Sequence, residues 1–318
     1  MNIKHIEINI GKACNNKCRF CMSSKSSLWD IKFVDIELLK EKLLNYYNKG
    51  YRSVGFLGGD VSIYPKLDQL IKFCREIGFI DIQAITNSMV FSNYNFAEKI
   101  LKAGLTRINI SIHSHIHELE NYLTGIPGGL QRKLKAIDNF NILINKGHLK
   151  SPLSINIVLN KINYKEILKT VLYFYRVKNV SDIRINFVWL SYDVKENWEE
   201  LKISYTEFLP YLKKLIYISI KEKIRITFDT IPSCIFYKID KKNYKKIIKK
   251  FLGENLDHIT EIDWTNNNTN FNWQEKKKDI LKTKFKQCDK CLYKNSCQGV
   301  WKEYYEIYGS DEFTPILF

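Results

Sequence analysis

The sequence lacks any apolar run long enough to cross a bilayer, which excludes a membrane-spanning helix. It also lacks the features of a secretory signal or transit peptide, because its first ten residues, MNIKHIEINI, alternate as a strand does. Disulfide staples are not expected in a chain of 318 residues without an export signal. With eight cysteines, most of them at cluster-like spacings, the sequence predicts a protein of the reducing cytoplasm.

Acidic residues are few, at 34 against 50 lysines and arginines, so the formal net charge is +16. Such an excess favours an anionic partner, nucleic acid included. Most of the excess is diffuse, since lysine, isoleucine and asparagine are abundant throughout, as expected of an AT-rich genome. The densest block, residues 238–250 (KIDKKNYKKIIKK), has isoleucines at helical spacing, and its lysines are expected to form a solvated helix face. Nucleic-acid binding is therefore the less favoured interpretation.

Strand-like and helix-like patterns alternate from Ile3 to about Leu190, and the composition, 45% hydrophobic, is that of a globular protein. Six strand–helix units in a row predict an α/β fold, a parallel sheet that is wrapped by helices and curls toward a barrel. The repeat stops after Leu190. The expected strands are Ile6–Ile10, Ser53–Leu57, Ile80–Thr86, Arg107–Ile112, Leu153–Leu159 and Ile183–Val188.

Three cysteines, Cys14, Cys18 and Cys21, stand in a C-x3-C-x2-C pattern directly after the first strand. Three thiolates on one loop can each bind one iron of a cubane cluster and leave the fourth iron without a protein ligand. Part of a zinc site is the alternative, although zinc motifs usually pair two ligands with a second pair well downstream.

This spacing, with Phe20 just before the last cysteine, resembles the radical S-adenosylmethionine (AdoMet) superfamily. The resemblance implies a partial (β/α)6, TIM-like barrel with its functional groups at the carboxyl ends of the strands. It also implies that the open iron of a [4Fe–4S] cluster chelates the amino and carboxylate groups of AdoMet and passes an electron to its sulfonium.

Gly58, Gly59 and Asp60 end the second expected strand, where this superfamily has a Gly-Gly-Glu signature that holds the AdoMet amino group. Glycines allow the backbone to approach a ligand closely, and a carboxylate can accept from an ammonium group. Alone, the tripeptide is a common turn. The shorter aspartate leaves open whether its side chain or only the backbone makes the contact.

The later strand ends carry further residues that resemble the superfamily's cofactor contacts. By alternation Ser111 and His113 face the barrel interior, and polar strand ends satisfied by nearby backbone are the alternative. A metal site of His113, His115 and His117 is less favoured, because the strand is expected to end near residue 112. The resemblance assigns cofactor contacts to Asn87, Ser111, His113 and Val158, with Asn160 and Asn163 as weaker candidates.

Four cysteines outside the first loop are candidates for a second metal site: Cys234, Cys288, Cys291 and Cys297. The last three form a C-x2-C-x5-C pattern. Four thiolates can complete a second [4Fe–4S] site or an all-cysteine zinc site, and spacing alone does not separate the two. The eighth cysteine, Cys74, shares an apolar helix face with its neighbours and is expected to be a buried small hydrophobe.

The C-terminal cysteines follow Ile-Pro-x-Cys and precede Gly309 and Pro315, an arrangement that resembles the twitch domain, the single-cluster relative of the SPASM domain. The segment 124–128 (TGIPG) resembles radical AdoMet enzymes that carry such domains. The resemblance implies a radical AdoMet core at residues 1–195 and a small α+β auxiliary-cluster domain at 196–318. A polar loop is expected at residues 265–270.

The superfamily's chemistry implies that a 5′-deoxyadenosyl radical abstracts a hydrogen atom from the substrate, with a flavodoxin or ferredoxin as electron donor. A ribosomally made peptide is the expected substrate, although no extra N-terminal domain for a leader peptide is evident. The alternatives are a small-molecule dehydrogenase or mutase of natural-product or nucleoside biosynthesis, and a zinc-bearing nucleic-acid-binding protein. No catalytic acid–base residue is assigned; Asn186, Trp189 and Tyr192 could line a pocket.

Overall fold

The computed structural model describes residues 3–22, 32–253, 260–263 and 270–317. Its main sheet has the strand order β7-β6-β5-β4-β3-β2-β1-β8-β9, and all neighbouring pairs are parallel except β8 and β9. The strands are β1 (Lys4–Asn9), β2 (Tyr51–Leu57), β3 (Asp81–Thr86), β4 (Arg107–Ser111), β5 (Ser154–Leu159), β6 (Asp182–Phe187), β7 (Arg225–Asp229), β8 (Thr260–Asp263) and β9 (Asn270–Asn272).

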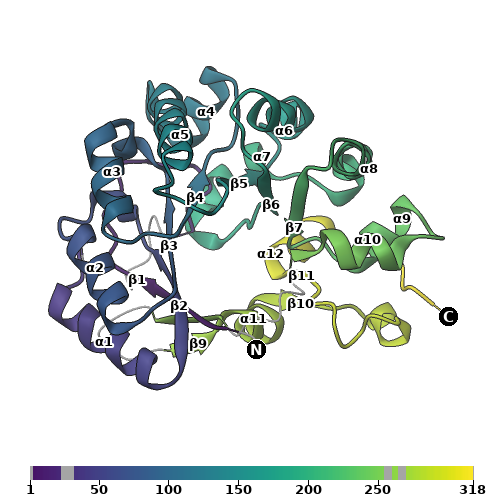
Figure 1. Cartoon of the computed structure of the whole chain (residues 1–318). Coiled ribbons are helices and arrows are strands. Elements are labelled where there is room, and N and C mark those ends of the chain that lie inside the picture. The colour runs from purple at the N-terminus through teal and green to yellow at the C-terminus, as the bar shows by residue number, and fades with distance from the viewer. Residues whose placement is uncertain (1–2, 23–31, 254–259, 264–269, 318) are drawn as a thin grey trace.

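Helices follow the outer face of the curved sheet, as Figure 1 shows. None of them, in the described part of the chain, is both long enough and apolar enough to span a membrane. The helices between the parallel strands are α1 (Ile36–Asn48), α2 (Leu67–Ile77), α3 (Tyr94–Lys102), α4 (His117–Thr124), α5 (Gly129–Asn145), α6 (Ile167–Arg176), α7 (Trp198–Leu201) and α8 (Tyr205–Glu222).

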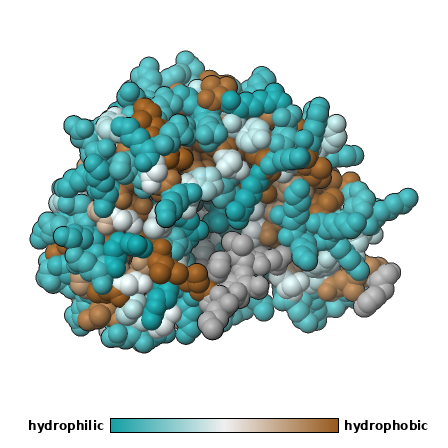
Figure 2. Space-filling view, viewed as in Figure 1, coloured by the Kyte–Doolittle hydropathy of each residue, from teal (hydrophilic) through white to brown (hydrophobic). Residues whose placement is uncertain are grey.

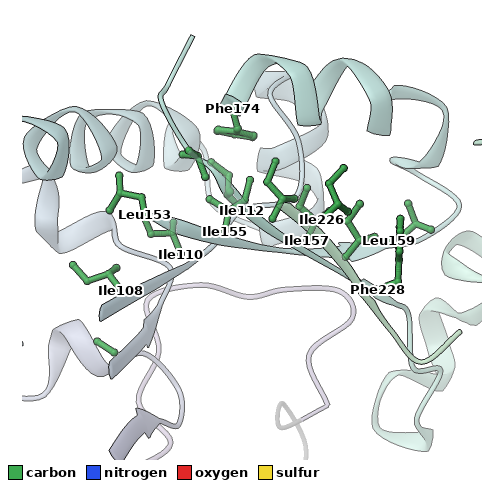
Figure 3. Packing of buried hydrophobic residues seen from close by; sticks show 14 of the residues in the cluster. Ile108, Ile110, Ile112, Leu153, Ile155, Ile157, Leu159, Phe174, Ile226 and Phe228 are labelled. Atoms are coloured by element: carbon green, nitrogen blue, oxygen red, sulfur yellow. The ribbon is translucent and has the colours of Figure 1, made fainter. Parts of the chain in front are cut away.

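Strand alternation divides the sheet into an apolar outer face and a polar inner face. In Figure 3, Ile155, Ile157 and Ile226 lie on the face that the helix carrying Phe174 covers, and all four side chains are buried. The intervening residues point the other way, into the lumen of the half-barrel. They are largely polar, and include Glu7, Asn9, Asn109, Ser111, Asn156, Arg184 and Asn186.

Seven parallel strands form this half-barrel, which confirms the predicted TIM-like fold but extends it by one strand. The repeat does not stop at Leu190, since α8 leads into β7 and β7 pairs in parallel with β6. The short helices at Tyr192–Asn197 and Trp198–Leu201 separate β6 from α8 and break the sequence periodicity. The division of the chain at residue 195 stays a prediction.

The C-terminal part is small and mixed. It contains α9 (Ser233–Ile239), α10 (Tyr244–Phe251), the β8–β9 hairpin beside β1, α11 (Trp273–Lys276) with a π-helical turn at Lys277–Leu281, and α12 (Lys302–Tyr308). Strands β10 (Lys282–Thr283) and β11 (Val300–Trp301) form a separate antiparallel pair. The polar loop predicted at 265–270 lies outside the described residues, except that Asn270 begins β9.

Candidate functional site

The first cysteine loop follows β1 at the carboxyl end of the half-barrel. Cys14 is exposed, Cys18 and Cys21 are half-buried, and none of the three forms a disulfide within the described residues. Asn16 lies between two of the sulfur atoms: its backbone N–H donates to Sγ of Cys14 at 3.4 Å and its Nδ2 to Sγ of Cys18 at 3.8 Å. Hydrogen bonds of this kind tune the reduction potential of iron–sulfur clusters.

The three thiols are neighbours and influence one another electrostatically. Burial, together with the charges of Cys21 and Cys14, raises the pKa of Cys18 to about 12, while Lys133 opposes the shift. A bound metal would therefore have to displace the protons. Within the described residues no three His, Cys, Asp or Glu side chains converge closely enough to hold a single metal ion.

The paired glycines after β2 hold the cysteine loop by backbone contact. The N–H of Gly59 donates to the carbonyl of Gly11 at 2.8 Å, and the N–H of Asp60 donates to the carbonyl of Ala13 at 2.8 Å. A Cβ on Gly59 would lie 2.1 Å from the Ala13 oxygen, and one on Gly58 would lie 2.4 Å from the Gly11 oxygen. Glycine is required here because the two backbones touch.

We expect Gly59→Ala to displace the cysteine loop, since backbone at 2.1 Å cannot yield as a flexible side chain can. Iron bound after anaerobic reconstitution should fall at least about twofold, with a loss of stability of about 1–3 kcal/mol. The matched control is Gly129→Ala, where the added methyl group would meet side chains only at 3.7 Å. Equal iron content in both variants would contradict the assigned role of Gly59.

A second clamp holds the other half of the loop. The N–H of Lys17 donates to the carbonyl of Thr124 at 2.8 Å, and that of Arg19 to the carbonyl of Leu123 at 3.0 Å. Gly125 lies so close that a Cβ there would be 2.7 Å from the Lys17 oxygen. The TGIPG segment singled out in the sequence therefore begins at a direct contact with the cysteine loop.

The carboxylate of Asp60 faces protein donors. It accepts from the backbone and hydroxyl of Ser62, from Oγ1 of Thr86 at 2.9 and 3.0 Å, and from the N–H of Asn87 at 2.5 Å. Burial raises the pKa of Asp60, and these donors oppose the shift. The side chain thus ties the end of β2 to the end of β3. Its predicted contact with the AdoMet amino group stays a prediction, and the structure directs the backbone of this motif, not the carboxylate, toward the loop.

Three asparagines are buried at the ends of β1, β3 and β4. Nδ2 of Asn87 lies 4.0 Å from Sγ of Cys14 and donates to Oδ1 of Asn15 at 2.5 Å. Nδ2 of Asn9 and Oδ1 of Asn109 are buried and have no hydrogen-bond partner among the residues that the structure describes. A buried polar atom without a partner is costly unless a ligand satisfies it. Asn9 was not identified from the sequence; its place at the end of β1, two residues before Gly11, was the available signal.

Phe20, His113 and Val158 form one contact group. The rings of Phe20 and His113 meet edge to face at 4.6 Å, and the N–H of Val158 donates to Nδ1 of His113 at 3.1 Å. Nδ1 is therefore the acceptor, and the neutral ring carries its proton on Nε2. Asn163 donates to the carbonyl of His113 at 3.0 Å, and Asn160 donates to that of Val158 at 3.1 Å. These two asparagines thus support the strand ends.

We expect the wild-type protein to lose stability on acidification through His113. Burial lowers the pKa of its imidazole from 6.5 to about 4, so the unfolded chain binds the proton more readily between those pH values. Stability therefore falls as the pH drops through this window, by about 2 kcal/mol between pH 7 and pH 5. Urea unfolding of metal-free wild type and His113→Gln at both pH values measures the difference. If the free energy of unfolding of His113→Gln fell as much as that of wild type between pH 7 and pH 5, this assignment would be wrong.

A buried ion pair beneath the site was not found from the sequence. Nζ of Lys133 lies 2.6 Å from Oε1 of Glu120, and both side chains are fully buried. Oε2 of Glu120 accepts from the N–H groups of His113 and Ser114 at 2.7 and 2.8 Å. Lys133 also donates to the carbonyl of Ser111 at 2.9 Å. Ser111 is thus held by its backbone. No local pattern signals such a pair, because its members lie 13 positions apart on two helices.

The other histidines of the trio do not join His113. His115 contacts Thr170 through Nδ1 at 2.9 Å, and His117 is the first residue of α4. Cys74 is fully buried on the apolar face of α2, as predicted.

The lumen itself is charged on the side where the C-terminal part meets the barrel. Nζ of the buried Lys277 lies 3.4 Å from Oδ1 of Asp229, at the end of β7. Burial raises the pKa of Glu7 on β1, and Arg184 and Lys277 oppose the shift, so these four groups lie within electrostatic reach. Of the suggested pocket residues, Asn186 donates to Asn156 at 2.7 Å.

Aromatic residues also lie where the C-terminal part meets the barrel. The rings of Trp189 and Trp301 stack at 4.5 Å, with Trp273 at 6.5 Å from Trp189. Tyr192 is exposed and donates to Glu306. The end of β6 is therefore packed against the C-terminal part.

The four later cysteines line one cavity. Cys234 lies on α9, and the other three cysteines lie in the segment 288–297. Burial raises the pKa of Cys234, and the charges of the other three cysteines add to the increase. The N–H of Gly299 donates to Sγ of Cys297 and that of Ile316 to Sγ of Cys291, each at 3.4 Å. Apolar side chains close the walls, among them Phe285, Val300 and Phe313. Four thiols with N–H donors around an apolar cavity fit an iron–sulfur cluster.

Comparison with known proteins identifies the family of the half-barrel. A sequence model of the Radical SAM superfamily matches residues 8–174. A probable GTP 3′,8-cyclase of Saccharolobus islandicus is 26% identical over 227 residues, which are 70% of this chain and 68% of the relative. One from Metallosphaera sedula is 28% identical over 172 residues, 53% of this chain and 51% of that protein.

Solved structures share the fold. Streptococcus suis SuiB bound to S-adenosylmethionine superposes with a TM-score of 0.65 at 17% identity, over 98% of this chain and 76% of SuiB. Methylornithine synthase (PylB) gives a TM-score of 0.51 at 15% identity, over 72% and 65% of the two chains. At such identities the likeness concerns the fold alone.

Proposed function

The chain belongs to the radical SAM superfamily, and from that premise we propose that Cys14, Cys18 and Cys21 hold a [4Fe–4S] cluster whose fourth iron binds AdoMet. The observation that carries the proposal is the loop of three adjacent thiols clamped between Gly59 and Thr124. When bound, this pair of cofactors supplies methionine and a 5′-deoxyadenosyl radical that takes a hydrogen atom from the substrate. The protein orients the cofactors and the substrate.

We assign AdoMet binding to residues at the carboxyl ends of β1 to β5. Within the described residues, Nδ2 of Asn9 and Oδ1 of Asn109 have no hydrogen-bond partner and offer a donor and an acceptor, and Asn87 lies beside Cys14. Phe20, His113 and Val158 form an apolar edge next to them. Because His113 stays neutral, it adds no positive charge beside a sulfonium. Gly58, Gly59, Asp60 and Ser111 complete the proposed set.

We propose a second [4Fe–4S] cluster on Cys234, Cys288, Cys291 and Cys297, in a twitch-like domain. With four protein ligands it has no vacancy for substrate, so we assign it to electron transfer and to shaping the pocket. A variant without Cys14, Cys18 and Cys21 should show one residual cluster whose spectrum does not respond to substrate. A clear response would contradict the electron-transfer role.

We propose a ribosomally made peptide as the substrate. The TGIPG segment supports this, since it resembles enzymes with auxiliary clusters and contacts the first cysteine loop. The fold of SuiB, which has been solved with its precursor peptide SuiA, covers 98% of the chain. A small-molecule substrate is the second candidate. It is favoured by the charged lumen around Glu7, Asp229 and Lys277 and by the cyclase relatives, whose named substrate is GTP.

The experiment is anaerobic reconstitution with iron and sulfide, reduction with dithionite and addition of AdoMet. We expect 5′-deoxyadenosine, together with iron absorption in the visible range. Deuterated candidate peptide and deuterated GTP, tested in separate reactions, then report the substrate by transfer of deuterium into 5′-deoxyadenosine. A protein that holds zinc and no iron would instead support the nucleic-acid-binding alternative.

A further inference from the structure

One acidic and one basic side chain face each other across the lumen of the half-barrel. Glu7 lies on β1 and Arg184 on β6, and four strands separate β1 from β6 in the sheet. Their inward side chains therefore approach one another only across the lumen. Of the charges that act on Glu7, that of Arg184 has the largest effect, although the structure describes no ion pair between the two groups. A gap thus separates the carboxylate from the guanidinium.

Solvent reaches this gap from inside the barrel. Figure 2, viewed as in Figure 1, shows the molecule hollowed near its centre, with hydrophilic side chains in the hollow. Arg184 is exposed although both of its neighbours along β6 are fully buried, and Glu7 is half-buried between two fully buried isoleucines. A molecule that enters the lumen can therefore contact both charges.

The two side chains are not satisfied by the protein. Within the described residues, neither Glu7 nor Arg184 makes a hydrogen bond or an ion pair through its side chain. Oδ1 of Asn186, two positions after Arg184 on the same face of β6, is buried and likewise has no partner there. Burial raises the pKa of Glu7, because the ionised carboxylate lacks a close compensating contact. Such groups are costly unless a ligand satisfies them.

Polar groups at the amino ends of the first strands are arranged differently. Oγ of Ser53 donates to Oδ2 of Asp81 at 2.7 Å and lies 2.7 Å from Nδ1 of His5. Nε of Arg107 donates to Oδ1 of Asp81 at 2.8 Å. In this network each group has a partner in the protein, as a structural role requires. The lack of such partners at Glu7 and Arg184 indicates that they serve a ligand instead.

The four charges around the gap balance. Lys277 pairs with Asp229 at 3.4 Å. One group of each sign, Glu7 and Arg184, is left for a ligand. A triphosphate would bring several negative charges near two carboxylates, which repel it. A zwitterionic group complements both free charges, since its ammonium suits the carboxylate and its carboxylate suits the guanidinium. Hydrogen bonds between such ionised groups are stronger than neutral ones.

We propose that Glu7 and Arg184 form a recognition pair, and that the part of the substrate held between them is zwitterionic. Glu7 accepts from an ammonium group, and Arg184 donates to a carboxylate. In a peptide the two groups are a basic and an acidic side chain; in a small molecule they are the head group of an amino acid. The inference rests on the proposed function, which makes the chain an enzyme that orients a bound substrate.

The test compares Glu7→Gln and Arg184→Gln with wild type, each reconstituted and bound to AdoMet. The control is Glu76→Gln with Arg132→Gln, which removes the same two charges from exposed positions of α2 and α5. One probe mixture contains short peptides of mixed sequence with both termini capped. The other contains the common amino acids with their N-acetyl and methyl ester derivatives, which keep one charge each. Native mass spectrometry identifies the molecules that stay bound.

Wild type and control should retain molecules with both a cationic and an anionic group at least about tenfold over those with only one. Glu7→Gln should lose the preference for the cationic group alone, and Arg184→Gln that for the anionic group alone. Selection from the peptides or from the amino acids supports the recognition pair and shows which source carries the zwitterion. A wild type that selects neither, variants that select as wild type does, or GTP retained in preference to both mixtures would overturn the proposal.

A stability measurement separates recognition from a structural role. Because Glu7 has no partner to lose, urea unfolding of metal-free Glu7→Gln should have a midpoint equal to or above that of wild type. A clearly lower midpoint would mean that the carboxylate supports the fold. Formation of 5′-deoxyadenosine from dithionite and AdoMet alone tests the proposed function separately. A protein that forms it but selects no zwitterion refutes only the recognition pair, whereas a protein that forms none refutes the proposed function.

Discussion

Replacing Cys14, Cys18 and Cys21 together by alanine should abolish 5′-deoxyadenosine formation, with a fall on the order of 1,000-fold or more, or about 4 kcal/mol of barrier. The physical reason is that these thiols are the only proposed protein ligands of the cluster that binds AdoMet. Bound iron should fall from about eight to about four atoms per chain, because the four-cysteine site is untouched. Iron analysis and quantification of 5′-deoxyadenosine by mass spectrometry make the measurement.

The matched control is Cys74→Ala, which removes a buried thiol from the apolar face of α2. That variant should keep its full complement of iron, with a stability loss of about 1 kcal/mol for the small cavity. If the triple variant still forms 5′-deoxyadenosine, or if it keeps all of the iron, the assignment of the first cysteine loop is wrong.

Replacing Lys133 by methionine should destabilise the protein by about 3–5 kcal/mol, because Glu120 is left as a buried charge without its partner. Urea unfolding of the metal-free protein measures the loss. The control is Lys178→Met, which breaks the pair with Asp138 at 2.8 Å. About half of that aspartate side chain is exposed, so the control should cost about 1 kcal/mol or less.

The double variant Lys133→Met with Glu120→Gln should recover part of the loss, since no unpaired charge remains and the amide can still accept from the N–H groups of His113 and Ser114. It should nevertheless bind AdoMet more weakly than wild type. Lys133 fixes the carbonyl of Ser111 and lies within electrostatic reach of Cys14 and Cys18. A double variant as unstable as Lys133→Met alone would show that the buried charge is not the cause.

The sequence predicts those parts of the site that depend on local spacing. Cys14, Cys18 and Cys21 lie on one loop, so their proximity follows from the two short intervals between them. The Gly-Gly-Asp motif lies at the end of β2 as predicted, and its proposed contact with AdoMet stays a prediction. Its contacts within the protein were not predicted. Gly59 touches the backbone of the cysteine loop, and Asp60 accepts from β3 residues. Which atoms a motif faces depends on the neighbouring strand, and spacing along the chain does not contain that information.

What the sequence does not predict depends on contacts between distant segments. Glu120 and Lys133 appear as ordinary charged helix residues, and only the packing of α4 against α5 buries them together. The strand β7 was placed outside the barrel because the short helices after β6 interrupt the spacing of the repeat. The pair of Lys277 with Asp229 likewise joins the C-terminal part to the barrel across 48 positions.

The central claim is that the cluster on the first cysteine loop keeps one iron for AdoMet. The most direct measurement is electron–nuclear double resonance on the reduced cluster with AdoMet that carries ¹⁵N in its amino group and ¹⁷O in its carboxylate. We expect hyperfine coupling of both nuclei to the cluster, and its loss in the variant without Cys14, Cys18 and Cys21. A reduced wild-type cluster with AdoMet bound but no coupling to either nucleus would contradict the account.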